Sequence, residues 1–316
     1  MIMAPRQGDC PEIAAARAAW AERGDAAAAL ALLPLGAAAE RAVMGHFARA
    51  ATKACDCKAE RNLAGALASI PRTLRMMFIH AYQSYLWNHA ASHRARTYDM
   101  EHAVEGDLVA DNAPSAGASD AADAEEDDAE AQRGGLAGVR VRQVTAAEAA
   151  AKSVPIDDVL LPLPAASSMY PGNSVREVYA RLADGDGVSL SGGQHSVREF
   201  SLSGFTGGYR HLMHRPTRLA FRLLRYEDPG RDLTRSDLTA ILEAEGRRTV
   251  DPLAQPPPEP SVSDDSAHEL GQGRYLALQL SFQLPASGYA TMLIRELLKT
   301  STTVAFHKGL NAHADE

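Results

Sequence analysis

The sequence predicts an α+β fold in which a helix-rich first part precedes a mixed or antiparallel sheet. Residues 11–70 are rich in alanine and have the apolar spacing of helices. Their expected core residues are Trp20, Leu30, Leu32, Leu33 and Leu35. Residues 275–284 alternate leucine or phenylalanine with smaller or polar side chains, which predicts a strand, and a turn then leads into a closing helix. The 316 residues suffice for a core without a disulfide or a metal.

Residues 69–96 predict a long helix with Pro71 in its first turn, where the missing N–H of proline costs no hydrogen bond. Apolar residues three or four positions apart predict one buried face: Leu74, Met77, Phe78, Ala81 and Tyr85. Cations and amides occupy the remaining surface: Arg72, Arg75, Gln83, Asn88, Arg94 and Arg96. His89 and His93 stand four positions apart, as two metal ligands would, but no third ligand is evident and we expect no metal.

Shorter elements follow in the middle and at the end of the chain. Residues 136–145 predict a strand whose inward residues are Val139, Val141 and Val144. A short helix is expected to begin at Ser174 and to end at the turn of Gly185 and Gly187. Ser287 is the expected N-cap of the closing helix. That helix is expected to direct Met292, Leu293, Leu297 and Leu298 inward.

The net charge of −8 is concentrated in one interval. No Lys or Arg occurs between Arg96 and Arg133, and the interval holds twelve acidic residues. Residues 111–135 also lack large apolar side chains, so we expect a disordered acidic loop over about 99–135. Two interpretations are open: the loop mimics a nucleic acid and competes for the protein's own basic surface, or it is a tolerated insertion.

The rest of the chain is basic. Residues 249–273 form a second acidic stretch, and its prolines at 256–258 predict a loop that does not pair in a sheet. Outside both stretches 32 bases stand against 23 acids. Six arginines lie between Arg198 and Arg225, with aromatic and histidine residues among them and Glu199 as the one acid. This pattern favours contacts with phosphates and bases, although a solvated pair of arginine-rich strands also explains it.

Several classes of protein are disfavoured by simple counts. Three cysteines make an odd set too sparse for a disulfide framework, which indicates a reducing compartment. Apolar runs stay well below 18 positions, which excludes a spanning helix, and the first residues lack a secretion signal. Neither a nucleophile-elbow motif nor a phosphate-binding loop motif occurs. The residues alone therefore predict an intracellular α+β protein with a basic, aromatic-bearing surface.

Five segments between about residues 12 and 302 share one resemblance. They are IPRTLRMMFIHAYQSYLWNHAASHR, EGDLV, DVLLPLP with YPGN, VREFSLSGFTGGYRHLMHRP and LALQLSFQLPASGYATMLIRELLKTS. In this order they resemble the TruD family of tRNA and mRNA pseudouridine synthases, in its eukaryotic form. The resemblance implies that uridine is isomerised without a cofactor or a metal. An aspartate attacks the flipped-out nucleoside, the glycosidic bond breaks, and the base rotates and reattaches through C5.

The sequence departs from the family at the catalytic motif. The family's nucleophilic aspartate lies in a GxKD-type motif and its stacking aromatic in an NYFG-type motif, and neither occurs here. Asp107 in EGDLV and Phe205 in SGFTGG do not fit these contexts, so we expect no catalytic residue and no turnover by this chain alone. The resemblance implies an insertion domain over residues 1–199 and part of the catalytic sheet over residues 200–316. Such a partial sheet would have unpaired edges and an exposed apolar face.

Candidate contact residues lie in two groups, for RNA or for a pocket wall. The first comprises Arg72, Arg75, Tyr82, Gln83, Asn88 and Arg94; the second comprises Arg210, Arg215, Ser287, Tyr289 and Arg295. We expect tRNA or mRNA as the partner, no membrane, a monomeric chain, and a location in the nucleus or cytoplasm. Two other interpretations are open: a non-catalytic RNA-binding remnant, and an interaction protein with an acidic arm.

Overall fold

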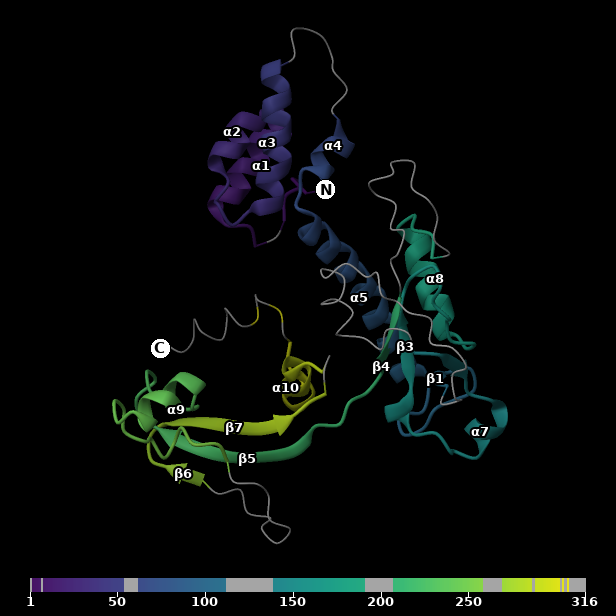
Figure 1. The fold of residues 1–316 in the computed structure, drawn as a ribbon, viewed down its shortest axis with the longest axis vertical. Coiled ribbons are helices and arrows are strands. Elements are labelled where there is room, and N and C mark those ends of the chain that lie inside the picture. Colours follow the sequence, from purple (N-terminus) through teal and green to yellow (C-terminus); the bar gives the residue numbers. More distant parts are fainter. Residues whose placement is uncertain are drawn as a thin grey trace. The chain divides into compact units, whose positions relative to one another are not determined.

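The computed structural model describes residues 2–6, 8–53, 62–111, 139–190, 207–257, 269–285, 288–301, 303 and 306. They form two compact units, Met1–Leu212 and Met213–Glu316, whose helices and strands confirm the predicted α+β class (Figure 1). The expected domain boundary at residue 199 precedes this division, because a strand at residues 208–211 pairs within the first unit. None of the described helices is long and apolar enough to cross a membrane.

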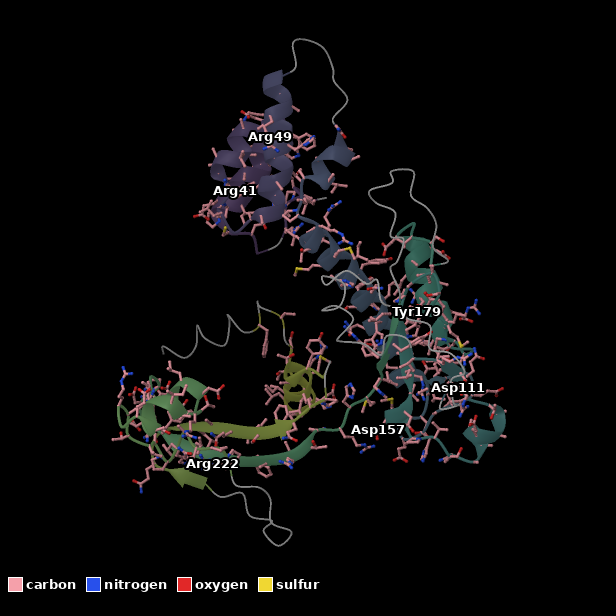
Figure 2. All side chains as sticks on the ribbon, in the orientation of Figure 1. Arg41, Arg49, Asp111, Asp157, Tyr179 and Arg222 are labelled. Atoms are coloured by element: carbon pink, nitrogen blue, oxygen red, sulfur yellow. The ribbon has the colours of Figure 1, made fainter. Side chains whose placement is uncertain are left out.

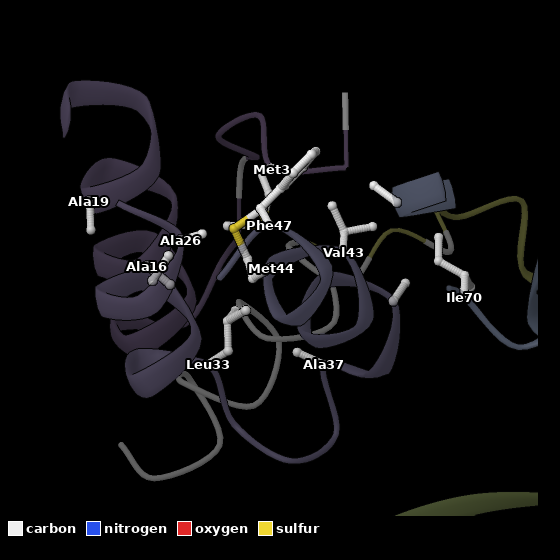
Figure 3. Packing of buried hydrophobic residues seen from close by; sticks show 13 residues of the cluster. Met3, Ala16, Ala19, Ala26, Leu33, Ala37, Val43, Met44, Phe47 and Ile70 are labelled. Atoms are coloured by element: carbon white, nitrogen blue, oxygen red, sulfur yellow. The ribbon is translucent and has the colours of Figure 1, made fainter. Parts of the chain in front are cut away.

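Four helices begin the first unit: α1 (Pro11–Arg23), α2 (Ala26–Leu32), α3 (Ala38–Lys53) and α4 (Leu63–Ala68). Their alanines allow close packing, and Ala16 is fully buried in one cluster with Met44 (Figure 3). Ala29 is fully buried in the same cluster. Phe47 stacks on Trp20 with ring centroids 5.2 Å apart. These helices therefore have a hydrophobic core of their own. Of the expected core residues, Leu33 is buried, Trp20 and Leu30 are half-buried, and Leu32 and Leu35 are exposed.

Local sequence sets the break between the first two helices. Gly24 has a φ of +63°, a left-handed conformation that suits glycine, and its N–H donates to the carbonyl of Trp20. The side chain of Asp25 then accepts a hydrogen bond from the N–H of Ala28 at 2.9 Å, which caps α2.

Helix α5 (Arg72–Thr97) confirms the predicted long helix but buries a different face from the expected one. Its buried residues are Gln83, Leu86, Ala90 and Arg94. Leu86 and Ala90 pack in a cluster with Leu161 and Tyr179. Of the residues expected inside, Met77, Phe78, Ala81 and Tyr85 are exposed and Leu74 is half-buried. The spacing identified an apolar stripe, but the described residues provide no cover for it.

An antiparallel sheet completes the first unit. Its strands are β1 (Leu108–Ala110), β2 (Val141–Gln143), β3 (Leu160–Leu163) and β4 (Gly208–His211), in the order β2-β1-β3-β4. The short elements α7 (Ala146–Ala150) and η1 (Ile156–Asp158) lie between β2 and β3 in the chain. Strand β3 is buried along its whole length, and its Leu161 shares a buried cluster with Val175 and Tyr179 of α8 (Val175–Gly185). Tyr179 of α8 is fully buried and donates to the carbonyl of Pro162 at 2.9 Å (Figure 2).

The predicted start of the disordered acidic loop is wrong. Residues 99–111 are ordered, because Leu108 and Val109 are buried apolar residues that hold β1 in the sheet. The rest of the predicted loop, to residue 135, lies outside the described residues. The strand predicted at 136–145 is confirmed only as β2, with Val144 buried just beyond it; residues 136–138 also lie outside the described part.

The second unit contains a three-stranded sheet in the order β6-β5-β7. Its elements are β5 (Thr217–Tyr226), α9 (Asp237–Ala244), β6 (Glu269–Gly271), β7 (Tyr275–Gln283) and α10 (Ala290–Leu298). Strand β5 pairs antiparallel with β7 over most of its length and parallel with β6. The strand predicted at 275–284 is thus confirmed, one residue shorter.

The more polar face of this sheet is buried, and its more apolar face is exposed. Arg222 and Leu224 of β5 and Gln279 of β7 are buried, whereas Phe221 and Leu278 on the opposite face are 55% and 48% exposed. The apolar side of α10, expected to point inward, is uncovered as well, because no residue of α10 is buried. An exposed apolar face is what the sequence predicts for a sheet that lacks part of its cover.

Strand β6 corrects the prediction that residues 249–273 do not pair in a sheet. Glu269–Gly271 lies opposite residues 223–225 of β5, because the prolines precede the strand and do not interrupt it. Leu253 and Ala254 are also buried. Gly271 has a φ of +90°, and a Cβ atom there would lie 2.4 Å from the carbonyl oxygen of Arg225. Residues 258–268 lie outside the described part of the chain.

The helical cluster gives a stability prediction. Met44→Ala removes a fully buried side chain and leaves a cavity, so the free energy of unfolding should fall by about 2–5 kcal/mol. Leu35→Ala is the control, because Leu35 is 87% exposed and its loss should cost less than about 0.5 kcal/mol. Urea unfolding followed by circular dichroism measures both. Equal losses would contradict the assignment of Met44 to the core.

Candidate nucleic-acid interface

Helix α5 carries most of the candidate contact residues, and its 26 residues include neither Asp nor Glu. Arg72 and Asn88 are exposed and Arg75 is half-exposed. Aromatic rings lie along the same helix: Tyr85 stacks on Tyr82 at 6.1 Å between centroids and meets the ring of His89 edge-on at 4.6 Å. Cations contact phosphates and aromatic rings stack on bases, so α5 carries both kinds of side chain that bind a nucleic acid.

Arg94 is a correction to the candidate set, because it is fully buried in an ion pair with Asp107. Its Nε donates to both carboxylate oxygens of Asp107, at 3.1 and 3.0 Å, and its Nη2 donates to Oδ2 at 2.8 Å. The carbonyls of Asp99 and His102 accept further bonds from the same guanidinium, at 2.6 and 3.2 Å. Arg94 therefore joins the end of α5 to the segment before β1 and has no surface for RNA.

Asp107 is the centre of a buried network that the sequence did not reveal. Besides Arg94, its carboxylate accepts hydrogen bonds from the N–H of Val104 at 2.9 Å and from Nδ2 of Asn173 at 2.9 Å. A carboxylate that is 0% exposed and accepts this many bonds stabilises the fold and is not placed to attack a substrate. Asp107 of the EGDLV segment is thus a structural residue in this chain.

Two further polar residues of α5 hold neighbouring segments. Gln83, a second candidate contact residue, is buried; its Nε2 donates to the carbonyl of Pro164 at 2.7 Å. His93 shares a hydrogen bond with the hydroxyl of Ser174 at 2.9 Å, and Tyr98 shares another at 2.8 Å. Ser174 does precede α8 as predicted, but its side chain makes no capping bond because these two residues engage it.

Tyr82 is half-exposed and borders the end of α8. Its hydroxyl donates to Oδ2 of Asp186 at 3.0 Å. Desolvation, and then the hydrogen bond and charge of Asp186, raise the pKa of Tyr82 to about 12. The neutral phenol is therefore part of the folded structure at ordinary pH.

The arginine-rich run is divided between the interior and the surface. Arg222 is buried, and its Nε donates to Oε1 of Gln279 at 2.7 Å (Figure 2). Its Nη2 donates to the carbonyl of Leu253 at 3.1 Å and also bonds the carbonyl of Gln255. Burial lowers the pKa of this guanidinium. Arg222 therefore fastens the 252–255 segment to the sheet, whereas Arg215 is exposed.

The remaining candidates are spread over both units. Arg210 is half-buried on β4, and Tyr289 and Arg295 are exposed at and within α10. Ser287, the predicted cap of that helix, lies outside the described residues, as does the start of the arginine-rich run.

The excess of bases over acids in the ordered part of the chain is smaller than we predicted, because five of the twelve acids in the first acidic interval are ordered. These are Asp99, Glu101, Glu105, Asp107 and Asp111.

An open pocket of about 670 Å³ lies elsewhere in the first unit. Its lining includes Tyr98, Gly106, Gln143, Gly172 and Asn173. No candidate contact residue and no cationic side chain lines it within the described parts of the chain. The pocket therefore does not match the electrostatics of a phosphate site.

Three comparisons with known proteins place this geometry in context. A family model described as tRNA pseudouridine synthase D (TruD) matches residues 1–297. The chain is 32% identical to the pseudouridylate synthase 7 homolog of Bos taurus over 98% of its own length and 38% of the bovine protein. It is 29% identical to the multisubstrate pseudouridine synthase 7 of Schizosaccharomyces pombe, over 96% of this chain and 40% of the yeast protein.

A solved structure shows the same fold. It is the crystal structure of the putative tRNA pseudouridine synthase D from Methanosarcina mazei, with a TM-score of 0.56 and 21% sequence identity. The likeness covers 95% of this chain and 53% of the archaeal chain. The chain thus spans about two fifths of the length of the two curated relatives and about half of the archaeal chain.

The buried ion pair gives a prediction on stability. Asp107→Asn leaves the Arg94 guanidinium buried without its counter-charge, so the free energy of unfolding should fall by about 3–5 kcal/mol. Glu22→Gln is the control, because the Glu22–Arg23 pair is 3.9 Å apart and largely exposed; its loss should cost less than about 1 kcal/mol. Urea unfolding measures both. A loss for Asp107→Asn no larger than the control would refute the structural role of the pair.

Tyr82 gives a prediction on pH dependence. Its pKa is about 12 in the folded chain against 10 ordinarily, so the neutral phenol's contribution to stability is complete below pH 10 and is lost as the pH rises towards 12. The difference in unfolding free energy between the native chain and Tyr82→Phe should shrink over that window. Asp186→Asn removes the negative charge of the acceptor, which helps to raise the pKa of Tyr82. The pH interval over which the difference shrinks should therefore become narrower. A difference that stays constant between pH 10 and 12 would contradict the assigned environment.

Proposed function

Because the chain belongs to the TruD family, we propose that it binds RNA and supplies part of an enzyme that isomerises uridine to pseudouridine. The observation that carries this proposal is the family match, which extends over residues 1–297. The names of the relatives support the reaction type, and tRNA or mRNA is the proposed substrate class. The proposed location is intracellular, where such RNA occurs.

Two exposed surfaces support the RNA-binding part of the proposal. The first is the surface of α5, where Arg72 and Asn88 are exposed and the rings of Tyr82 and Tyr85 stack on each other. The second unit adds Arg215 at its surface. Contacts of this kind bind the phosphate backbone without reading the base sequence, so the affinity should depend strongly on salt.

We propose that this chain alone does not turn over uridine. The sequence contains no GxKD-type motif for the nucleophilic aspartate, and Asp107, which lies in a family-like segment, is buried and fully engaged. In this proposal the first unit corresponds mainly to the insertion domain and the second to part of the catalytic sheet. A non-catalytic RNA-binding remnant or an interaction protein is the alternative, and the uncovered apolar residues of the second unit favour the latter.

One experiment separates these functions. The chain is incubated with tRNA and mRNA fragments that carry tritium at C5 of uridine, because a new C5–C1′ bond releases that hydrogen to water. Binding to the same RNAs is measured by filter retention over a salt series. We expect no tritium release and an affinity that falls steeply with salt. Tritium release by the chain alone would contradict the proposed inactivity, and no binding at low salt would leave only the interaction protein.

A matched pair of variants tests where the RNA lies. Arg215→Gln removes an exposed cation of the arginine-rich run and should weaken binding and lower the slope of log affinity against log salt by about 1. Arg248→Gln removes the same charge from an exposed arginine outside the arginine-rich run, and should leave the affinity nearly unchanged. Equal effects of the two variants would indicate attraction by net charge without a defined contact.

A further inference from the structure

The start of strand β5 contains an arginine in a strained backbone conformation. Arg218 lies within β5, yet its φ is +49°, in the left-handed region. In this conformation a Cβ atom crowds the following carbonyl oxygen, so glycine and, less often, asparagine normally occupy it. Lys152 and Lys299 share this sign of φ among the described residues, but each lies at the end of a helix, where a left-handed residue is common. Arg218 ends no helix.

A β-bulge accounts for the conformation of Arg218 but not for the choice of arginine. Thr217 lies opposite Gln283 and Ala220 opposite Ser281, so β5 has one residue more than β7 between these two pairs. A bulge accommodates a left-handed residue and directs its side chain away from the regular alternation of the strand. Glycine would fit the same backbone without the steric cost. The arginine side chain therefore has a role that the backbone does not explain.

The side chain of Arg218 is exposed, and its guanidinium makes no hydrogen bond or ion pair with the residues that the structure describes. By contrast, Arg222 of the same strand is buried and bonded to Gln279. Neither β5 nor β7 contains Asp or Glu, so no carboxylate on either strand neutralises Arg218. Residues in sparsely populated conformations concentrate at ligand-binding sites, and an exposed guanidinium attracts an anion.

We propose that the bulge at the start of β5 presents Arg218 to a phosphate group of the RNA backbone. The site rests on the proposed function and names a contact for its RNA. Exposed Arg215 lies three residues earlier, and α10 begins at the same end of the sheet, where β7 ends (Figure 1). Tyr289, which directly precedes α10, is 58% exposed. Two arginines and an aromatic ring at one end of a sheet suit an RNA strand, because guanidinium groups hold phosphates and a ring stacks on a base.

The test replaces Arg218 by glycine in the full chain and measures stability and RNA affinity. The unfolding temperature should rise by about 2–4 °C, because glycine removes the steric cost of the left-handed conformation. The affinity for tRNA and mRNA fragments, measured by filter retention, should fall by about 3–10-fold at about 0.1 M salt. The slope of log affinity against log salt should decrease by about 1. Fragments of different sequence should be affected alike, since a phosphate contact does not read the bases.

Two further variants serve as controls. Arg218→Lys keeps both the charge and the left-handed residue, so the salt slope and the unfolding temperature should match those of the native chain. Lys152→Gly removes a cation and a left-handed side chain that follow α7 in the first unit. It should change the affinity by less than about twofold, because salt screens a charge that makes no direct contact.

Four results would overturn the phosphate contact. An affinity unchanged by Arg218→Gly, or lowered equally by Lys152→Gly, would overturn it while RNA binding itself remains. A lower unfolding temperature for Arg218→Gly would show that the side chain supports the fold. Weakening confined to one RNA sequence would indicate a base contact in place of a phosphate contact. Absence of RNA binding by the native chain at low salt would overturn the proposed function, and the contact with it.

Discussion

The buried pair of Arg94 and Asp107 is the interaction that holds helix α5 to the sheet of the first unit. Burial of two charges is costly unless each is hydrogen-bonded, and here the guanidinium and the carboxylate satisfy each other together with backbone carbonyls and Asn173. The pair fixes the end of α5 to the start of β1, while Gln83 fixes its middle to the segment after β3. Polar side chains therefore set the position of this helix, and apolar packing fills the space around them.

The second unit uses an arginine in a similar way. Arg222 lies in the middle of β5 and crosses to Gln279 on β7 and to backbone carbonyls after α9. In each unit, an arginine from a segment that suggests nucleic-acid binding is buried and makes structural hydrogen bonds: Arg94 in the first and Arg222 in the second. The exposed cationic surface is accordingly smaller than the number of arginines suggests, and it includes Arg72 and Arg215.

The sequence predicted the positions of helices and strands better than it predicted which of their faces are buried and which residues they contact. Periodicity located α5, α8 and β7 because hydrophobic spacing reflects local backbone geometry. It did not identify the covered faces of α5 and β7, because coverage depends on polypeptide distant in sequence. The partners of Asp107 were also beyond prediction, since Asn173 is 66 residues away. Strand β1 was not predicted, because its segment is rich in acidic residues and was assigned to the disordered loop. Its short apolar sequence forms a strand because it pairs with β2 and β3.

The pairing of β1 with β2 has a consequence for how this protein can change over evolution. Ala110 lies opposite Val141, and the N–H of Asp111 donates to the carbonyl of Arg140 at 2.8 Å. The segment between these residues therefore leaves and re-enters the sheet at a single rung. The register of β1 and β2 is set by the rungs from Leu108–Gln143 to Ala110–Val141. A change in the number of residues between positions 111 and 140 therefore leaves these pairings as they are, whereas a single insertion within either strand would shift every rung beyond it.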